Sequence, residues 1–316
     1  MAKIPVHIIT GFLGSGKTTF LREILQNQKD SNIALVVNEL GEIGLDNILI
    51  DSEFIEEKTV VISSGCMCCH KREDLSEKFK ELLNRYEQNG QKLDRILIET
   101  TGLASPAPIL FTFLSDAFLS NHFEVANIIT CIDSLNGLSQ IQNNEEALSQ
   151  IIHSDCIVFT KVDLNADIES LGHYIHSLHY GIKLIRKELF SFENLLEIKH
   201  EVSDTNQTTT TPHKDSIHSL CLYFEEVIDW SAFSIWLSML LHRYGSQILR
   251  IKGLVDIGEE YLIHINGVGH LVHPPTHIKD LKKEKRSKLV FIAKNLELNL
   301  IEESLKRFLA LAPSNF

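Results

Sequence analysis

The sequence of 316 residues contains no long hydrophobic run. A membrane-spanning helix needs roughly 18 consecutive apolar residues, and no segment of this chain reaches that length. The first ten residues, Met-Ala-Lys-Ile-Pro-Val-His-Ile-Ile-Thr, also lack the apolar core and the small-residue cleavage site of a secretory signal. We therefore expect a cytoplasmic protein without a membrane partner.

Positive charge is in deficit, because 30 basic residues stand against 42 acidic residues and give a net charge of −12. A strongly acidic surface argues against nucleic acid as a partner, although a local basic pocket for a small phosphorylated ligand is allowed. Apolar residues make up 44% of the chain and charged residues 23%. This balance is typical of globular proteins and excludes a disordered or collagenous chain.

A disulfide framework is also missing, because three of the six cysteines lie within four positions, at Cys66, Cys68 and Cys69. In a cytoplasmic protein, clustered thiols more often bind metal or carry redox chemistry. A helical pattern follows them, and its dipole favours thiolates. We predict that the three cysteines bind Zn²⁺ or a similar divalent ion such as Co²⁺, with redox sensing and an inert structural role as alternatives. The candidates for a fourth ligand are His70, Glu39, Glu42, a water molecule and a group from a client protein.

Two domains are expected from the order of local patterns. Up to about residue 200, short apolar strands alternate with helical patterns, which predicts an α/β domain of the P-loop NTPase kind with a mostly parallel sheet. Residues 203–216 are polar and contain a proline, which is typical of a linker. Successive strands flanked by helices then predict a smaller α+β domain. The expected limits are 1–202, 203–216 and 217–316.

The most specific motif is Gly-Phe-Leu-Gly-Ser-Gly-Lys-Thr-Thr at residues 11–19, which matches a phosphate loop. Glycines let successive N–H groups point toward a phosphate, and the following helix adds its positive N-terminal end. Lys17 can reach the β- and γ-phosphates, and the Thr18 hydroxyl can ligate Mg²⁺. The predicted nucleotide-binding residues of this loop are Gly11, Gly14, Ser15, Gly16, Lys17, Thr18 and Thr19.

A carboxylate follows at the end of the apolar run at residues 95–99, where Glu99 precedes Thr-Thr-Gly. An acid at the carboxyl end of a strand beside a phosphate loop can hold Mg²⁺, directly or through water. We predict that Glu99 is the second Mg²⁺ ligand and that Gly102 senses the γ-phosphate. The predicted catalytic residues are Lys17, Thr18 and Glu99. The alternative is an acid that only caps a strand.

Base selection is predicted for Thr-Lys-Val-Asp at residues 160–163, which also follows an apolar strand. The Asp163 carboxylate can accept the N1–H and N2 amino hydrogens of guanine, whereas adenine offers no such pair. The aliphatic stem of Lys161 can cover the flat base, and Thr160 begins the motif. The sequence therefore favours GTP over ATP.

Residues 38–46 form an acidic, glycine-containing stretch after a predicted strand, with Glu39 and Glu42 among its acids. Because the stretch follows a strand of the same sheet, we expect it near the nucleotide. We interpret it as a switch segment, with an ordinary acidic loop as the alternative.

Taken in order, these motifs resemble the CobW-like family of P-loop GTPases, which are metal chaperones and metallocentre-assembly GTPases. The matching segments are residues 10–19, 38–46, 65–69, 98–102 and 160–163, with 249–255 and 289–292 in the C-terminal part. Residues 100–108 look most like the YjiA-type branch. Many members have Asn where this chain has Thr160.

The resemblance implies a slow GTPase that uses GTP and Mg²⁺, holds Zn²⁺ or a similar ion at the cysteines and delivers it to a client apo-metalloprotein. One alternative is a metal- or redox-sensing GTPase that regulates a partner without delivering an ion. Another is a small-molecule kinase, which would prefer ATP and leave Asp163 and the cysteines without a role. The sequence is compatible with a monomer and with a homodimer.

Overall fold

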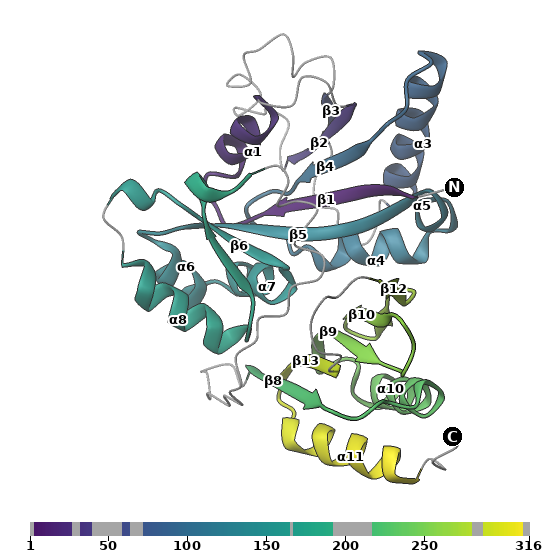
Figure 1. Cartoon of the computed structure of the whole chain (residues 1–316). Coiled ribbons are helices and arrows are strands. Elements are labelled where there is room, and N and C mark those ends of the chain that lie inside the picture. The colour runs from purple at the N-terminus through teal and green to yellow at the C-terminus, as the bar shows by residue number, and fades with distance from the viewer. Residues whose placement is uncertain are drawn as a thin grey trace. The chain divides into compact units, whose positions relative to one another are not determined.

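The computed structural model describes residues 3–26, 32–39, 59–63, 72–164, 167–191, 217–279 and 287–311 (Figure 1). The chain divides into two compact units, residues 1–172 with 183–201 and residues 173–182 with 202–316. The described residues form two β-sheets, one of seven strands and one of six. The predicted linker, residues 203–216, lies outside the described residues, so the domain limits stay a prediction.

The seven-stranded sheet has the order β3-β2-β4-β1-β5-β6-β7, and each pair of neighbouring strands is parallel. Its strands are β1 (Ile4–Thr10), β2 (Ile33–Glu39), β3 (Thr59–Ser63), β4 (Arg95–Glu99), β5 (Phe123–Asp133), β6 (Cys156–Thr160) and β7 (Lys183–Arg186). The helices of this part of the chain are α1 (Lys17–Gln26), α3 (Arg72–Gln88), α4 (Ala107–Ser115), α5 (Ala117–His122), α6 (Gly137–Asn143), α7 (Glu145–His153) and α8 (Ile168–Leu178), with 3-10 helices η2 (Val162–Leu164) and η3 (Lys187–Leu189).

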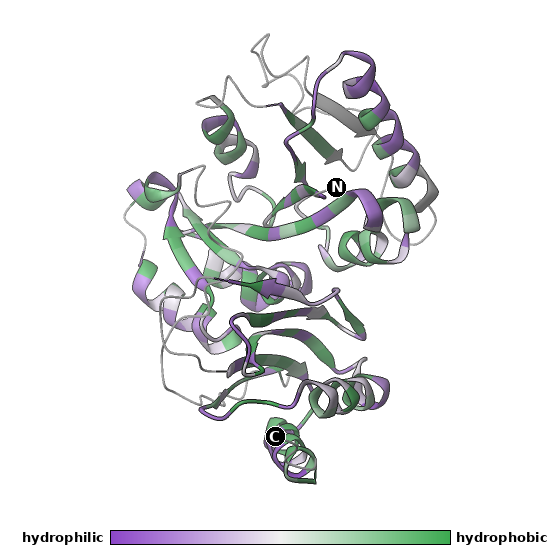
Figure 2. Cartoon of the chain, turned by 45° about the vertical axis from the view of Figure 1, so that its right-hand side comes forward, coloured by the Kyte–Doolittle hydropathy of each residue, from purple (hydrophilic) through white to green (hydrophobic). Residues whose placement is uncertain are grey.

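Helices cover both faces of this sheet because its strands are apolar on both sides. One face packs against α1, where Phe20 and Leu21 contact a buried cluster that includes Ile9, Leu97 and Ile129. Helices α4, α5 and α7 contact the long strand β5. In Figure 2 the strands are largely green, for hydrophobic residues, while the helices alternate green with purple. Burial on both faces explains why these strands read as nearly continuous apolar runs.

The second sheet has six antiparallel strands in the order β11-β10-β9-β13-β8, and β12 pairs with β10. Helices α10 (Trp230–Tyr244) and α11 (Leu298–Leu311) pack together, and the Trp236 indole N–H donates to Ser304 Oγ at 3.0 Å between them. The strands are β8 (Ile217–Phe224), β9 (Ile248–Asp256), β10 (Leu262–Val268), β11 (Leu271–Val272), β12 (Thr276–Ile278) and β13 (Ser287–Lys294).

The predicted fold class is confirmed, since a parallel sheet with helices is followed by a smaller unit of strands and helices. Within the described ranges, no helix combines the length and the apolar character needed to cross a membrane.

Candidate active site

The loop between β1 and α1 has a backbone that only glycine adopts at its first position. Gly11 has a φ of +145°, and a Cβ atom built there would lie 2.3 Å from the Cys131 carbonyl oxygen. The loop then turns back on itself, because the Ser15 N–H donates to the Phe12 carbonyl oxygen at 3.1 Å. Helix α1 begins at Lys17, so its first N–H groups face the loop, as an anion-binding helix terminus requires.

The Lys17 side chain turns back over this loop. Its Nζ donates to the carbonyl oxygens of Gly11 at 2.9 Å and Phe12 at 3.2 Å. The ammonium group therefore lies on the loop whose N–H groups would contact a phosphate. Thr19, the last residue of the motif, is exposed on α1.

Thr18, in the first turn of α1, meets Glu99 at the end of β4. The Thr18 hydroxyl donates to Glu99 Oε1 at 2.6 Å, and Glu99 is only 6% exposed. The pair forms because β1 and β4 are neighbours and Glu99 lies opposite Ile9 in their register. A hydroxyl and a carboxylate beside a phosphate loop are hard oxygen ligands, so these residues fit Mg²⁺.

The segment after Glu99 packs closely on the phosphate loop. A Cβ atom at Gly102 would lie 2.8 Å from the Leu13 backbone nitrogen and 2.6 Å from the Leu13 side chain. The fully buried Gln150 of α7 donates from Nε2 to the carbonyl oxygens of Gly102 at 3.0 Å and Ala104 at 3.1 Å. Gln150 is a site residue that the sequence analysis missed, because an amide inside a helix carries no motif.

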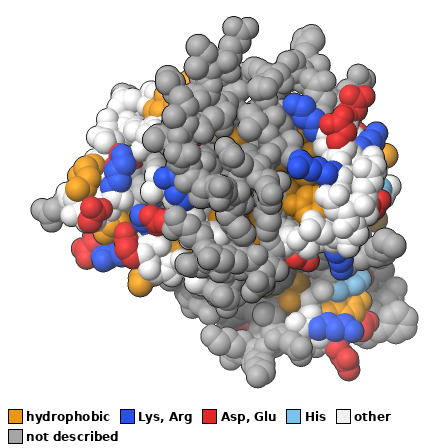
Figure 3. Space-filling model, turned by 90° about the horizontal axis from the view of Figure 1, so that it is seen from above, with side chains coloured by type: hydrophobic (Ala, Val, Ile, Leu, Met, Phe, Trp, Pro, Cys, Tyr) orange, Lys and Arg blue, Asp and Glu red, His pale blue; other side chains and the backbone are white. Residues whose placement is uncertain are grey.

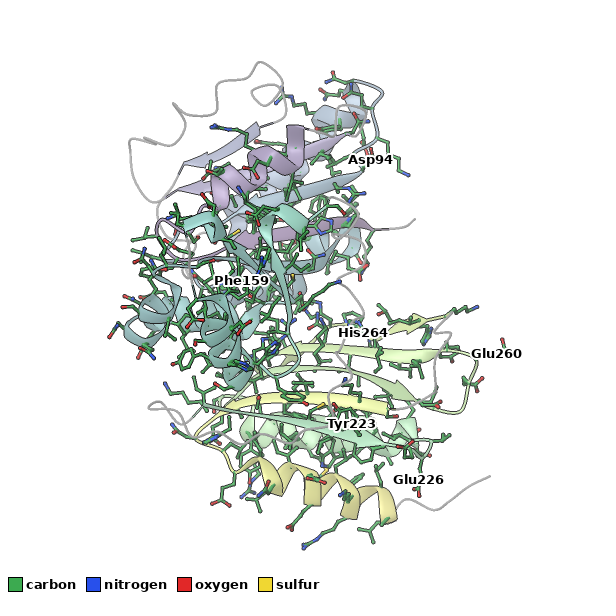
Figure 4. The ribbon with its side chains drawn as sticks, turned by 60° about the vertical axis from the view of Figure 1, so that its left-hand side comes forward. Asp94, Phe159, Tyr223, Glu226, Glu260 and His264 are labelled. Carbon is green, nitrogen blue, oxygen red and sulfur yellow. The ribbon has the colours of Figure 1, made fainter. Side chains whose placement is uncertain are left out.

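At the end of β6, the Thr160 hydroxyl donates to the Ser15 carbonyl oxygen at 2.8 Å, which joins this strand to the phosphate loop. Lys161 follows with a φ of +56°, and its Nζ lies 2.8 Å from Asp133 Oδ2 at the end of β5. Asp163 lies on η2 with its side chain exposed. Figure 4 labels Phe159, the residue of β6 directly before Thr160.

The structure thus brings the phosphate loop together with Glu99, Gly102 and Thr160 at one edge of the sheet. Asp133 was also missed, although the sequence gives it the same signal as Glu99, an acid that ends an apolar strand. On the face drawn in Figure 3, acidic and basic side chains of the described residues lie among one another.

The cysteine motif and Glu42 lie outside the described residues, and only the backbone of Glu39 is described. Glu39 ends β2, and its register partner is Ser63, the last residue of β3. Among the side chains that the structure describes, no group of three or more His, Cys, Asp or Glu residues is arranged to hold a metal ion. The metal ligands therefore stay a prediction.

A parallel sheet whose central strand runs into such a loop belongs to the P-loop nucleoside triphosphatases as a class. The family follows from comparison with known proteins. Residues 5–185 match the CobW/HypB/UreG nucleotide-binding domain, and residues 217–309 match the cobalamin synthesis protein CobW C-terminal domain. The chain therefore belongs to the CobW/HypB/UreG family.

Two curated relatives and one solved structure are similar to this chain. The zinc chaperone YjiA of Escherichia coli (strain K12) is 30% identical over 281 residues, which are 86% of this chain and 88% of the relative. The zinc-regulated GTPase metalloprotein activator 1 of Schizosaccharomyces pombe is 38% identical over 167 residues, 51% of this chain and 39% of the relative. The crystal structure of Zn(II)-bound YjiA GTPase from E. coli has a TM-score of 0.73 and 25% identity, and the match covers 98% of this chain and 99% of that chain. The predicted family and the predicted enzyme class, a GTPase, are confirmed.

Proposed function

We propose that this GTPase is a metal chaperone, which binds GTP with Mg²⁺, holds Zn²⁺ or a similar ion at Cys66, Cys68 and Cys69, and delivers the ion to a client apo-metalloprotein. The observation that carries the proposal is the arrangement of strand ends. The phosphate loop follows β1, and the predicted switch and cysteine segments follow β2 and β3 at the same edge of the parallel sheet. The names of the relatives, a zinc chaperone and a zinc-regulated GTPase metalloprotein activator, support it.

The nucleotide half of the proposal rests on the contacts of the phosphate loop. The Lys17 ammonium can exchange the loop carbonyls for the β- and γ-phosphates. Thr18 and Glu99 would hold Mg²⁺, and this ion, when bound, offsets negative charge on the phosphates. Slow hydrolysis needs no strong base, because phosphoryl transfer depends mainly on positioning.

Guanine recognition is assigned to the segment after β6. The exposed Asp163 carboxylate can accept the two hydrogens that guanine presents and that adenine lacks. The expected result is that GDP binds more tightly than ADP, and equal dissociation constants would contradict the assignment.

The metal half rests on sheet order. Strand β3 is three positions from β1, so these two strands lie about 14 Å apart, at about 4.8 Å per strand. Coupling would pass through residues 38–46, which begin in β2, the strand between β3 and β4.

Zinc titrations test this coupling. The affinity for Zn²⁺ is expected to differ by about tenfold between the protein with a non-hydrolysable GTP analogue and the protein with GDP, a usual size for coupling between sites. Cys66→Ala should lower zinc affinity and leave GDP binding unchanged. The matched control is Cys221→Ala, because Cys221 is buried in β8 and is expected to contribute nothing to zinc binding. Equal zinc affinity in both nucleotide states would overturn the switch.

The zinc measurement requires competition with a chelator of known affinity. Zn(II) is also bound in a structure of a triple mutant of YjiA GTPase, in which two of the three substitutions replace cysteines. Total zinc content alone therefore does not identify the tight site. Only the tightest ion is expected to be lost in Cys66→Ala.

Delivery separates the proposal from the alternative of a metal- or redox-sensing regulator. Isotopically labelled Zn²⁺ loaded on the protein should move to an apo-metalloprotein faster after GTP hydrolysis than in the presence of the non-hydrolysable analogue. A regulator would bind its partner and retain the label.

A further inference from the structure

We infer that Asp133 is a positioning residue of the nucleotide site. It holds the Lys161 side chain in place so that the aliphatic stem of Lys161 packs against the flat base. The inference rests on the proposed function, since it takes Lys161 to cover the base. Asp133 lies at the end of β5, next to β6 in the sheet, and its register partner is Thr160. It therefore stands directly beside the segment that is proposed to recognise guanine.

The Asp133 carboxylate is 2% exposed and accepts four hydrogen bonds. Oδ1 accepts from the backbone N–H groups of Leu135 at 2.9 Å and Asn136 at 3.4 Å, which close the turn before α6. Oδ2 accepts from the Asn136 side chain at 3.0 Å and from Lys161 Nζ at 2.8 Å. Oδ1 thus serves the turn alone, and Oδ2 fixes a charge on the neighbouring segment while it also accepts from Asn136.

Lys161 is held in a conformation that lysine rarely adopts. Its φ is +56°, in the left-handed region that favours glycine, and such a backbone persists only where the surroundings impose it. Its side chain is 39% exposed although its ammonium group is paired with Asp133. The ammonium end of Lys161 is thus anchored while its aliphatic stem stays accessible, as packing against a base requires.

The backbone next to Lys161 is held as well. The N–H and the hydroxyl of Ser134 both donate to the Thr160 carbonyl oxygen, at 3.1 Å and 2.7 Å. The Thr160 hydroxyl donates in turn to the Ser15 carbonyl oxygen at 2.8 Å. Residues 133–134 therefore hold both the side chain and the backbone of the segment that starts at Thr160, and this segment is tied to the phosphate loop.

Asp133→Asn separates the two roles of the carboxylate. The asparagine oxygen can still accept from the two backbone N–H groups of the turn, whereas its NH₂ group cannot accept from Lys161 or from the Asn136 side chain. A released Lys161 side chain has to be ordered again when a base binds, so base affinity falls while phosphate affinity does not. The affinity for GDP is expected to weaken about tenfold, as for the loss of one charge-assisted hydrogen bond.

A double-mutant cycle with Lys161→Met tests whether Asp133 acts through Lys161. Methionine keeps an apolar stem and removes the ammonium group. In the Lys161→Met background, Asp133→Asn should change the GDP dissociation constant by less than about twofold. Inorganic pyrophosphate, which has no base, should compete with a fluorescent GDP equally well for the wild type and Asp133→Asn. Thermal unfolding of each variant shows that it is folded.

The matched control is Asp155→Asn. Asp155 directly precedes β6, is 9% exposed and accepts the Ile128 N–H at 2.9 Å, but it lies at the other end of the strand. Its substitution should leave GDP affinity unchanged.

An equal loss for Asp133→Asn in both backgrounds, or an equal loss of pyrophosphate affinity, would show a purely structural role and overturn the inference. The cycle is also measured with ADP. Equal wild-type affinity for GDP and ADP would contradict guanine recognition but not the role of Asp133, because the Lys161 stem would pack on either base.

Discussion

Among single residues, Lys17 is expected to matter most for nucleotide binding. Its ammonium group lies on the phosphate loop, and a charge-assisted contact with phosphate is lost in Lys17→Ala. The affinity for GTP should fall about 100-fold, measured by displacement of a fluorescent nucleotide. Lys187→Ala is the matched control, because Lys187 pairs with Glu23 at 2.9 Å in the same unit and has no role in the loop. Similar losses for both variants would contradict the assignment.

Asp133 also predicts a dependence of stability on pH. Burial raises the pKa of its carboxyl group, but hydrogen bonds from Lys161, Asn136 and the Leu135 N–H outweigh it and hold the pKa below the ordinary value of 3.8. The stabilisation is complete above that ordinary value and is lost as the pH falls through the lower native pKa.

Urea unfolding between about pH 6 and about pH 3 measures this contribution. The wild type should lose more free energy of unfolding on acidification than Asp133→Asn, which has no carboxyl group at this position to protonate. Parallel curves for the two proteins would show that the native pKa of Asp133 is not lowered.

The sequence predicts residues well where a motif fixes both their identity and their spacing. The phosphate loop and Glu99 were predicted, and the Thr18–Glu99 hydrogen bond of 2.6 Å brings them together. Gln150 could not be predicted, because its partners are backbone carbonyls 46 and 48 residues away that no sequence pattern encodes. Asp133 lies between these cases, since it ends an apolar strand but lacks a motif.

At the scale of elements, strands were predicted more completely than the helices that follow Glu99. The apolar run at 95–99 coincides with β4, and the apolar strand predicted before residues 160–163 is β6, because both runs are bounded by polar residues. Helix α4 has the sequence Ala-Pro-Ile-Leu-Phe-Thr-Phe-Leu-Ser, whose continuous apolar run does not distinguish a buried helix from a strand. Strand β12 has three residues and depends on pairing with β10, which a local pattern cannot reveal.

Helix α7 is expected to control turnover through Gln150. The two hydrogen bonds from its amide hold the backbone of residues 102–104 against the phosphate loop, and Gln150→Leu removes both at similar volume. The kcat for phosphate release should fall about tenfold, with the GDP dissociation constant changed by less than about twofold. The control is Gln140→Leu on α6, whose longer contact of 3.4 Å reaches the Leu13 carbonyl oxygen from an exposed position. An unchanged kcat in Gln150→Leu would exclude this role.

At the scale of the whole molecule, the order of the strands makes the proposed coupling testable without knowledge of the client. If residues 38–46 respond to both ligands, each ligand stabilises the conformation that the other prefers. Linkage then requires that each ligand change the affinity for the other by the same factor. Thermal unfolding reports this as an increase in Tm with a non-hydrolysable GTP analogue and Zn²⁺ together that exceeds the sum of the separate increases. For a unit of roughly 200 residues the excess should be about 2–4 °C per kcal/mol of coupling.

Lys17→Ala should abolish the response to the nucleotide and Cys66→Ala the response to zinc, and each should remove the excess. Strictly additive increases in the wild type would show that the two sites bind independently, because a ligand that does not distinguish two conformations cannot shift their populations.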